Sequence, residues 1–565
     1  MNLLANFLER TEFDSYEDFV TNYKLKIKDN FNFGYDVVDE YARLVPQKKA
    51  LLRYCNDSFP SEIREYDFAE VSELSNRAAN ALREKGVRKG DRALLMMKET
   101  PETWFVMLGL EKLGAIAVPA SFQLMPEDIV YRCSAAGIRF ICYAADEQLA
   151  EHVKTALPDC ETVIGTAVVG EENEIPQGAY DLRKMIAEAS PSLERVMTEN
   201  SDTMLIYFSS GTTGMPKMIV HDFTYPLGHI TTAKYWQHVE DDTRHFTYSD
   251  SGWAKFGWGK IFGQWIAGAE IVTFDVKGRF SPEKLLQMID EVKLTTFCAP
   301  PTVYRYLIKE DMSHIDFSSL RHCSTAGEPL NPEVFEQFRR QTGQEIYEGF
   351  GQSESSVLFA NFGWDPIKLG STGKPSPLYK LDLVDDDGNS VEDGVVGSIV
   401  VKDTDKNHPT GLFRRYHNDP EAMEKLWPES VYNTGDLAWR DSDGYFWFEG
   451  RNDDVIKCSG YRIGPFEVES ALMTHPAVLE CAVTAVPDPV RGQVVKATII
   501  LARGYEASDA LKKELQNHVK KTSAPYKYPR VVEFVTELPK TTSGKIRRAE
   551  IRKNDMQKLR EAKSK

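Results

Sequence analysis

Hydrophobic residues in the first third of the chain alternate between helical and strand-like spacing. From 68 to 82 they recur every three or four positions, which predicts a helix with one buried face that ends near Gly86. The largely apolar run 92–97 predicts a buried strand, and the two patterns return as a helix at 104–113 and a strand at 115–118. Repeated alternation of helix and strand predicts an α/β architecture with a largely parallel sheet.

The last part of the chain has a pattern of its own. It indicates two strands followed by an amphipathic helix, at 480–486, 494–501 and 510–521. A polar, turn-prone segment at 450–454 precedes it. Because 565 residues exceed one typical core, we expect two units. We predict a large N-terminal domain of α/β sheets at 1–452 and a small, mobile α+β C-terminal domain at 453–565.

Charge separates the same two parts of the chain. The net charge of −17 argues against a general nucleic-acid binder. Residues 454–565 hold 21 basic and 13 acidic residues, a net charge of +8, so the remainder carries −25. A basic unit on an acidic body indicates a part that handles an anionic ligand, and a lysine-rich solvated surface is the alternative.

Cysteine usage and hydropathy indicate a cytoplasmic protein. The eight cysteines occur singly, and Cys142, Cys298 and Cys481 lie in apolar or strand-like runs, so we expect reduced core thiols and no metal site built from cysteine. Mean hydropathy is −0.40, and no apolar run approaches the roughly 20 residues that a membrane-spanning helix needs. The first residues lack the basic leader of a secretory signal. We therefore predict no integral membrane association.

The most distinctive local motif joins two predicted strands, 204–208 and 218–220. The residues expected to bind phosphate there are Ser209, Ser210, Gly211, Thr212, Thr213, Gly214 and Lys217. Glycines and small hydroxylated residues leave backbone N–H groups free to line a concave loop, and the lysine adds positive charge, which suits a polyphosphate. The loop is not a Walker A motif, because the GxxxxGK[ST] spacing is absent and a strand follows. A plain Ser/Gly hairpin is the alternative.

With several further motifs in the same order, this loop resembles the adenylate-forming superfamily of acyl-CoA synthetases, luciferases and peptide-synthetase adenylation domains. The resemblance extends from about Tyr66 onward and is strongest to the medium-chain acyl-CoA synthetases. It implies that a small carboxylic acid is activated as an acyl-adenylate and transferred to CoA, with ATP, Mg²⁺ and coenzyme A as cofactors. It also implies a large rotation of the C-terminal domain about a hinge at Asp453 between the two steps.

Two motifs, 325–330 and 347–354, are implied to form the adenine and metal sites. The residues implied to contact the nucleotide are Gly327, Glu328, Pro329, Glu348, Gly349, Phe350, Gly351 and Gln352. By resemblance Phe350 stacks on adenine, Ser353 is a catalytic residue that bonds the α-phosphate or the substrate carboxylate, and Glu354 binds Mg²⁺. These residue types suit the ligands, because an aromatic face matches a purine and carboxylate oxygens match magnesium.

The ribose site is implied by a tight turn that ends in an aspartate. Asp436 is implied to accept hydrogen bonds from both ribose hydroxyls, which a carboxylate can do with its two oxygens. Arg451 resembles the arginine that also reaches the ribose or the phosphates. For an isolated TGD sequence, a turn cap is the alternative.

The C-terminal motifs are implied to serve the two chemical steps separately. A glycine-centred loop is implied to enter the active site for thioester formation, and it comprises Ser459, Gly460, Tyr461 and the catalytic Arg462. Arg491 and Lys520 stand where relatives contact CoA phosphates, although either suits a solvated surface. Lys545 matches the catalytic lysine that stabilises charge during adenylation.

The residue at 351 indicates the size of the carboxylic acid substrate. Gly351 stands where acetyl-CoA synthetases carry a tryptophan that closes the acyl pocket. The absent indole leaves room, so we expect a short-to-medium, branched or aromatic acid. Trp258, Phe262 and Trp265 follow helical spacing, which predicts one face of a helix as a pocket wall; a core position is the alternative. Trp258, Gly351 and Trp265 are therefore the predicted pocket residues.

Three other functions stay open. They are a stand-alone adenylation enzyme that loads an acyl or aminoacyl group onto a carrier protein, a luciferase-like oxygenase, and a regulator that binds nucleotide without turnover. We expect no carrier domain in this chain, because it ends soon after the Lys545 motif. Retention of Glu354, Asp436, Arg451 and Lys545 argues against the regulator. Two hypotheses on partners are a homodimer and acetylation of Lys545.

Overall fold

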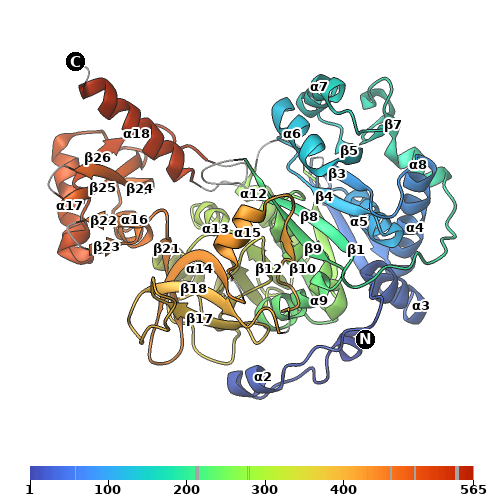
Figure 1. Cartoon of the computed structure of the whole chain (residues 1–565), viewed down its shortest axis with the longest axis horizontal. Coiled ribbons are helices and arrows are strands. Elements are labelled where there is room, and N and C mark those ends of the chain that lie inside the picture. Colours follow the sequence, from blue (N-terminus) through green and yellow to red (C-terminus); the bar gives the residue numbers. More distant parts are fainter. Residues whose placement is uncertain are drawn as a thin grey trace.

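The computed structural model (Figure 1) describes the chain except residues 58, 210–214, 277, 279, 407, 429, 459–460, 489–490, 541–545 and 564–565. Side chains are not described at 461, 462, 559, 562 and 563. Within the described chain, no helix is both long and apolar enough to cross a membrane.

The first large sheet contains the strands around the predicted nucleotide loop. In the described chain its spatial order is β19 (Arg415–Tyr416), β9 (Lys217–Asp222), β8 (Thr203–Ser209), β4 (Ile116–Pro119), β3 (Arg92–Met96), β5 (Ile138–Ala144), β6 (Gly165–Val169) and β7 (Tyr180–Asp181). The strands from β8 to β7 are parallel, whereas β9 is antiparallel to both of its neighbours. The parallel sheet expected from the early helix–strand alternation is therefore confirmed.

The second large sheet carries the motifs expected around adenine. Its described order is β16 (Lys374–Pro375), β15 (Phe359–Ala360), β14 (Ile346–Phe350), β13 (His322–Thr325), β12 (Thr296–Ala299), β10 (Arg244–Thr247), β11 (Glu270–Phe274), β1 (Lys49–Cys55) and β2 (Glu62–Asp67). From β14 to β1 the strands are parallel. Parallel strands need long crossover connections, which explains why residues so distant in sequence meet at one edge.

Helices cover both sheets. The α-helices of the body are α1 (Leu4–Phe7), α2 (Tyr16–Asn22), α3 (Glu40–Leu44), α4 (Phe68–Glu84), α5 (Pro101–Leu113), α6 (Pro126–Ala136), α7 (Glu147–Ala156), α8 (Leu182–Glu188), α9 (Tyr225–Ile230), α10 (Ala254–Gly259), α11 (Phe262–Ala267), α12 (Pro282–Glu291), α13 (Pro301–Leu307), α14 (Pro332–Thr342) and α15 (Pro420–Leu426). Short 3₁₀ or π turns are η1 (Gly34–Asp39), η2 (Leu157–Asp159), η3 (Glu172–Glu174) and η4 (Thr231–Trp236).

Helices α4 and α5 show how sequence and packing agree. Asp67 and Glu70 form a capping box that fixes the start of α4, as the periodicity from 68 predicted. Gly109 lets α5 approach α4, because a Cβ there would lie 2.9 Å from the backbone nitrogen of Ala79. Both helices therefore pack tightly against each other and bury the apolar faces predicted from their spacing.

A third, antiparallel sheet precedes the C-terminal part and consists of β17 (Lys380–Val384), β18 (Gly397–Lys402), β20 (Tyr432–Arg440) and β21 (Phe446–Arg451). The C-terminal part that follows has its own core, as predicted. Figure 1 shows its elements (red) grouped at one end of the molecule. They are β22 (Ile456–Cys458), β23 (Tyr461–Ile463), α16 (Pro465–Met473), β24 (Val478–Asp488), β25 (Gly492–Leu501), α17 (Asp509–Thr522), η5 (Pro525–Lys527), β26 (Val531–Phe534) and α18 (Arg548–Lys563). Their apolar cluster draws only on residues from Ile456 onward. The exact boundary and the hinge role of Asp453 stay predictions.

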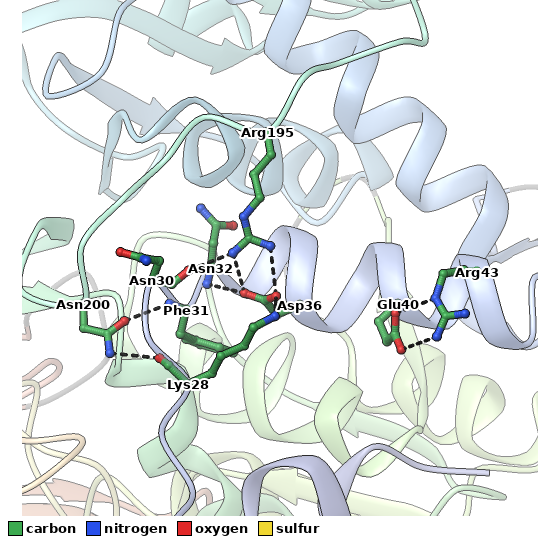
Figure 2. A network of polar contacts seen from close by, with 9 residues as sticks. All are labelled: Lys28, Asn30, Phe31, Asn32, Asp36, Glu40, Arg43, Arg195 and Asn200. Carbon is green, nitrogen blue, oxygen red and sulfur yellow. Dashed lines mark hydrogen bonds and ion pairs between the residues drawn. The ribbon is translucent and has the colours of Figure 1, made fainter.

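The N-terminal segment is tied to the chain that leads into β8 (Figure 2). Asp36 accepts hydrogen bonds from both terminal nitrogens of Arg195, at 2.9 and 2.8 Å, and from Nζ of Lys28 at 2.6 Å. Asn200 accepts from the backbone N–H of Phe31 at 2.8 Å and donates to the carbonyl of Lys28 at 3.0 Å. Because β8 begins just beyond Asn200, this network anchors the strand that carries the nucleotide loop.

Candidate active site

The predicted nucleotide loop lies between two paired strands. Ser209, at the end of β8, is the register partner of Lys217, at the start of β9, which matches the strand–loop–strand prediction. The residues between them, 210–214, lie outside the described residues. Nζ of Lys217 lies 4.8 Å from the centroid of the Tyr416 ring. Tyr416 belongs to β19, which pairs with β9. The lysine is therefore held at the mouth of the loop, where a polyphosphate would bind.

Glu354, the predicted Mg²⁺ ligand, lies within the electrostatic influence of this lysine. Its Oε1 accepts a hydrogen bond from the hydroxyl of Tyr416 at 2.9 Å. Burial raises the pKa of the Glu354 carboxyl, and the charges of Lys217 and Arg451 lower it in part. No cluster of three metal-ligating side chains exists among the described residues. A single carboxylate is nevertheless the donor set expected for Mg²⁺ that is bound largely through nucleotide phosphates.

The adenine motif is held by residues that the sequence did not identify. Glu328 accepts hydrogen bonds from Oγ1 of Thr302 at 2.8 Å and from Nη2 of Arg305 at 3.2 Å, so both partners come from α13. Gly327 has a φ of +106°, which favours glycine in this turn. Lys255, at the start of α10, donates to the carbonyl of Ala326 at 2.8 Å. Hydrogen bonds from α13 and from the start of α10 therefore hold the motif in place.

Glu348 and Phe350 stand on β14 directly beside that turn. Glu348 is 5% exposed, and burial raises the pKa of its carboxyl to about 8. It is therefore a neutral polar group at pH 7, able to hydrogen-bond with an adenine edge. The Phe350 ring lies 5.6 Å from Phe448 and 6.0 Å from Phe359, centroid to centroid, so its orientation is fixed by packing.

The predicted ribose site is connected to the adenine motif through Gln352. Nε2 of Gln352 donates to Oδ2 of Asp436 at 2.5 Å, and the hydroxyl of Tyr432 donates to Oε1 of Gln352 at 2.8 Å. Asp436 and Arg451 are register partners on β20 and β21, and Nε of Arg451 contacts Oδ1 of Asp453 at 3.1 Å. Gln352 thus orients the aspartate that is predicted to bind ribose, a role that only the structure reveals. Ser353 offers its carbonyl to His221 at 2.8 Å.

The C-terminal site residues are only partly described. Ser459, Gly460 and Lys545 lie outside the described residues, and of Tyr461 and Arg462 only the backbone, in β23, is described. Arg491 is exposed, and Lys520 lies over the Tyr528 ring at 4.0 Å. Their predicted contacts with CoA stay predictions.

The described residues on either side of 541–545 have defined contacts. Lys540 and Ile546 form a β-bridge, and Nζ of Lys540 contacts Oε2 of Glu480 at 2.8 Å. Two electrostatic effects connect this region with α13. Against the effects of burial, the charge of Glu480 acts to raise the pKa of Lys309, just beyond α13, and the charge of Arg305 in α13 acts to lower the pKa of Cys481. Lys540 and Ile546 therefore lie on the side of the C-terminal domain that faces α13 and the adenine motif.

The predicted acyl pocket differs in detail from the sequence interpretation. A Cβ on Gly351 would lie 2.2 Å from Cη2 of Trp258, and a Cβ on Gly349 would lie 2.6 Å from the indole of Trp236. The two indoles meet edge to face at 6.5 Å. The space left by the missing indole at 351 is thus occupied in part by Trp258, which reaches it from α10.

The expected single helical face is wrong, because the helix is interrupted. Helix α10 ends at Gly259 and α11 begins at Phe262, with Ile261 outside helical geometry between them. Trp265 is fully buried, lies 5.9 Å from the Phe68 ring, and donates its indole N–H to the carbonyl of Ala50 at 2.8 Å. This indole belongs to the core beside β1, which was the stated alternative.

Comparison with known proteins agrees with this arrangement. The family model of the AMP-binding enzymes matches residues 38–417, and that of the AMP-binding enzyme C-terminal domain matches residues 467–545. The acyl-coenzyme A synthetase ACSM3, mitochondrial, of Mus musculus is 41% identical over 96% of this chain and 94% of its own length. ACSM5, mitochondrial, of Homo sapiens is 40% identical over 94% of this chain and 91% of its own length.

Solved structures extend the likeness to three dimensions. The anthranilate CoA ligase AuaEII in complex with anthranoyl-AMP has a TM-score of 0.85 and 31% identity, covering 94% of this chain and 98% of that one. The acyl-CoA synthetase of Brucella canis has a TM-score of 0.72 and 32% identity, covering 97% of this chain and all of that one. This chain therefore belongs to the AMP-binding enzyme family and is an AMP-forming acyl-CoA synthetase that uses ATP, Mg²⁺ and coenzyme A.

Proposed function

We propose that this enzyme prefers compact acids, either methyl-branched acids of four or five carbons or aromatic acids. The observation that carries the proposal is the contact between Trp258 and Gly351, with Trp236 packed against Gly349. We infer that these two crossed indoles, beside two glycines separated by Phe350, form one wall of a short, wide acyl pocket. Such a wall accommodates a branched or flat acid, whereas a long linear chain would have to displace an indole.

Relatives with related substrates support the aromatic part of this proposal. AuaEII is an anthranilate CoA ligase at 31% identity, and a ligase of similar fold from Burkholderia xenovorans LB400, at 27% identity, is a benzoate CoA ligase. Both act on flat, short acids, as their names state. A pocket walled by the indoles of Trp236 and Trp258 is compatible with the same class of substrate.

The proposed chemistry assigns each step to groups of this chain. The substrate carboxylate attacks the α-phosphorus of ATP and pyrophosphate leaves, while Lys217 and the nucleotide loop hold the phosphates and Lys545 stabilises the developing charge. Mg²⁺ held by Glu354 would supply charge neutralisation at the phosphates. Asp436 and Phe350 orient the nucleoside, so that the carboxylate meets the phosphorus in line.

A substrate panel tests the preference. CoA-dependent AMP release is measured with acetate, propionate, butyrate, 2-methylbutyrate, octanoate and benzoate, as kcat/KM. We expect a maximum at 2-methylbutyrate or benzoate, with acetate and octanoate at least about tenfold lower, the discrimination that one or two methylene groups give. A maximum at acetate or octanoate would contradict the proposal.

A pair of tryptophan variants assigns the preference to the pocket. Trp258→Leu is expected to shift the maximum toward longer linear acids, because it removes the indole beside Gly351. Trp439→Leu is the matched control: this indole stacks on Trp447 at 5.1 Å, on the third sheet, and its loss should leave the order of substrates unchanged. An unaltered order in Trp258→Leu would place the specificity elsewhere.

A further inference from the structure

Asp250 is a carboxylate at the active-site edge that none of the roles above uses. It follows β10, and its Oδ1 accepts a hydrogen bond from the backbone N–H of Gly252 at 2.7 Å. Its Oδ2 accepts from Oγ of Ser121 at 3.2 Å, and Ser121 follows β4 of the other large sheet. Asp250 therefore stands where the carboxyl edges of the two sheets meet, which is where ligands bind in open α/β sheets.

The two edges come into close contact at Gly252, next to Asp250. A Cβ on Gly252 would lie 2.1 Å from the carbonyl carbon of Ala120. Glycine is therefore needed here for the two chain segments to meet. The position of Asp250 between them is fixed by backbone packing, as a positioned catalytic group requires.

The segment that follows Asp250 leads directly to the adenylate site. The backbone N–H of Trp253 donates to the carbonyl of Asp250 at 3.1 Å, and Lys255 donates to the carbonyl of Ala326 in the adenine motif. The indole nitrogen of Trp253 is buried and has no hydrogen-bond partner among the described residues. Asp250 is thus connected by one short turn to the segment that contacts the predicted adenine motif.

Other acidic groups at this edge already have partners that define their roles. Glu354 accepts a hydrogen bond from the hydroxyl of Tyr416. Glu328 forms an ion pair with Arg305 at 3.2 Å, and Glu99 forms an ion pair with Lys260. No ion pair of Asp250 occurs within the described part of the chain. Unlike Glu328 and Glu99, Asp250 is held by a hydroxyl and a backbone amide, and it retains capacity to accept a proton.

The protonation state of Asp250 suits proton transfer near neutral pH. Burial raises the pKa of its carboxyl to about 7, although the side chain is still partly accessible to solvent. The ionisable groups that act on it are Glu99, from the segment after β3, and Tyr248 on its own segment; Glu99 is in turn neutralised by Lys260. A base with a pKa near the working pH is the most effective proton acceptor.

We propose that Asp250 is the general base of the thioester step and takes the proton from the thiol of coenzyme A. The S–H bond breaks and its proton passes to Oδ2 of Asp250. The sulfur electron pair then forms the bond to the acyl carbon, the bond from that carbon to the phosphate oxygen breaks, and AMP leaves with those electrons. Asp250 afterwards releases the proton to solvent. No oxidant or further reactant is needed, and the proposal rests on the acyl-CoA synthesis established above, whichever acid is preferred.

The second step needs such a group more than the first. A carboxylate substrate is already a charged nucleophile, whereas a thiol with a pKa of about 8.5 is mostly protonated at pH 7. The thiolate is the reactive form. A positioned base typically contributes about 10²- to 10⁴-fold.

The test separates the two half-reactions in Asp250→Asn. Asparagine keeps an oxygen that can accept from the backbone N–H of Gly252, and its amide N–H can donate to Oγ of Ser121, so the turn is retained while the base is removed. Pyrophosphate release without CoA measures adenylation, and rapid-quench decay of preformed acyl-adenylate on addition of CoA measures thioester formation, from pH 6 to pH 9.5. The acid is the one that the wild type converts fastest.

We expect adenylation within about threefold of the wild type and thioester formation at least about 10²-fold slower at pH 7. The deficit should shrink as pH rises through the thiol pKa, because the thiolate then forms without help. Asp250→Glu should restore part of the rate. Asp290→Asn is the control: this partly exposed carboxylate on α12 pairs with Lys293 at 2.7 Å, and its loss should change neither step.

Three results would overturn the proposal. They are a thioester rate within threefold of the wild type at pH 7, an equal loss in both half-reactions, or a deficit in thioester formation that does not depend on pH. If Asp250→Asn fails to fold, Asp250→Glu decides: its thioester rate must show a displaced pH midpoint, whereas an unchanged midpoint refutes the base. A failure of the substrate proposal would appear separately, as a different best acid with the same loss in the second step.

Discussion

Buried carboxyl groups at the active-site edge and in the C-terminal domain differ in their partners. At the edge, Glu348, Glu354 and Asp250 form no ion pair within the described residues, although the charges of Lys217 and Arg451 act on Glu354, and burial raises the pKa of each carboxyl. In the C-terminal domain, Glu469 forms an ion pair with Arg548 at 2.7 Å, and there the arginine lowers the pKa that burial raises. The first arrangement leaves carboxyl groups available to ligands, whereas the second joins α16 to α18.

This difference teaches that burial alone does not decide what an acidic group does. A buried carboxylate without a cation destabilises the fold and persists where a ligand needs it. A buried ion pair holds two elements together, provided that both partners stay. The predictions that follow alter one class of group at a time.

The largest effect is expected from Arg548→Met. It leaves Glu469 buried and charged without its cation, so the free energy of unfolding of the C-terminal domain should fall by about 3–5 kcal/mol. Urea denaturation followed by tryptophan fluorescence and by limited proteolysis of the domain measures this. The neighbouring Arg547→Met is the control, because Arg547 is exposed and pairs with Glu550 on the surface.

A double variant sharpens this result. Arg548→Met with Glu469→Leu removes both charges, so most of the lost stability should return, as an apolar pair can replace a buried ion pair. If the double variant is as unstable as Arg548→Met, an effect other than the unpaired charge is responsible.

The next effect is a pH dependence that Glu348→Gln should remove. The unfolded chain releases the Glu348 proton near pH 4.3, whereas the folded chain holds it up to about pH 8. Between these values the folded state binds more protons, so the free energy of unfolding falls as pH rises, by an amount on the order of a few kcal/mol. Urea denaturation at several pH values should show a flatter slope in the variant; an unchanged slope would contradict the raised pKa.

A moderate effect is expected where two elements pack without spare space. In Gly351→Ala the new methyl group would meet Trp258, with the carbonyl of Ser356 at 2.7 Å. Overpacking of this kind costs about 1–3 kcal/mol, and the KM for the acid should rise because the indole is displaced. Adding Trp258→Leu should relieve both losses, and failure to do so would refute the contact as their cause.

The smallest effect is expected for Lys540→Gln. The ion pair with Glu480 is partly exposed, at 31% and 18% of the two side chains, so its contribution to stability is below about 1 kcal/mol. Because the pair holds the bridge between Lys540 and Ile546 on the side that faces α13, pyrophosphate release should slow by about two- to fivefold while decay of preformed acyl-adenylate with CoA is unchanged. Equal slowing of both would remove this role.

Local elements followed from the sequence because their causes are local. The helix expected over 68–82 is α4, the strand over 92–97 is β3, and the strands and helix expected near the C-terminus are β24, β25 and α17. Cys142, Cys298 and Cys481 are buried free thiols, as expected. Apolar spacing and helix caps act within a few residues, so a sequence is sufficient to find them.

Pattern reasoning failed where tertiary packing overrode the spacing. Trp258, Phe262 and Trp265 satisfy helical periodicity, yet the chain leaves helical geometry at Ile261 and sends Trp258 to Gly351 and Trp265 to the core. Glycines at 257, 259 and 263 weaken the helix and allow close contacts that periodicity does not report. Periodicity tells which residues are buried but not which partner they meet.

The sequence by itself determined the motifs, their order and hence the reaction: the nucleotide loop at 209–217, the adenine motif ending in Glu354, and the turn at Asp436. Only the tertiary structure decided which residues hydrogen-bond to the acidic side chains at the site. Tyr416 donates to Glu354, Gln352 donates to Asp436, and Ser121 donates to Asp250. The physical reason is that parallel strands are joined by long crossovers, so the residues at one sheet edge come from distant parts of the chain. No local pattern encodes which of them will touch.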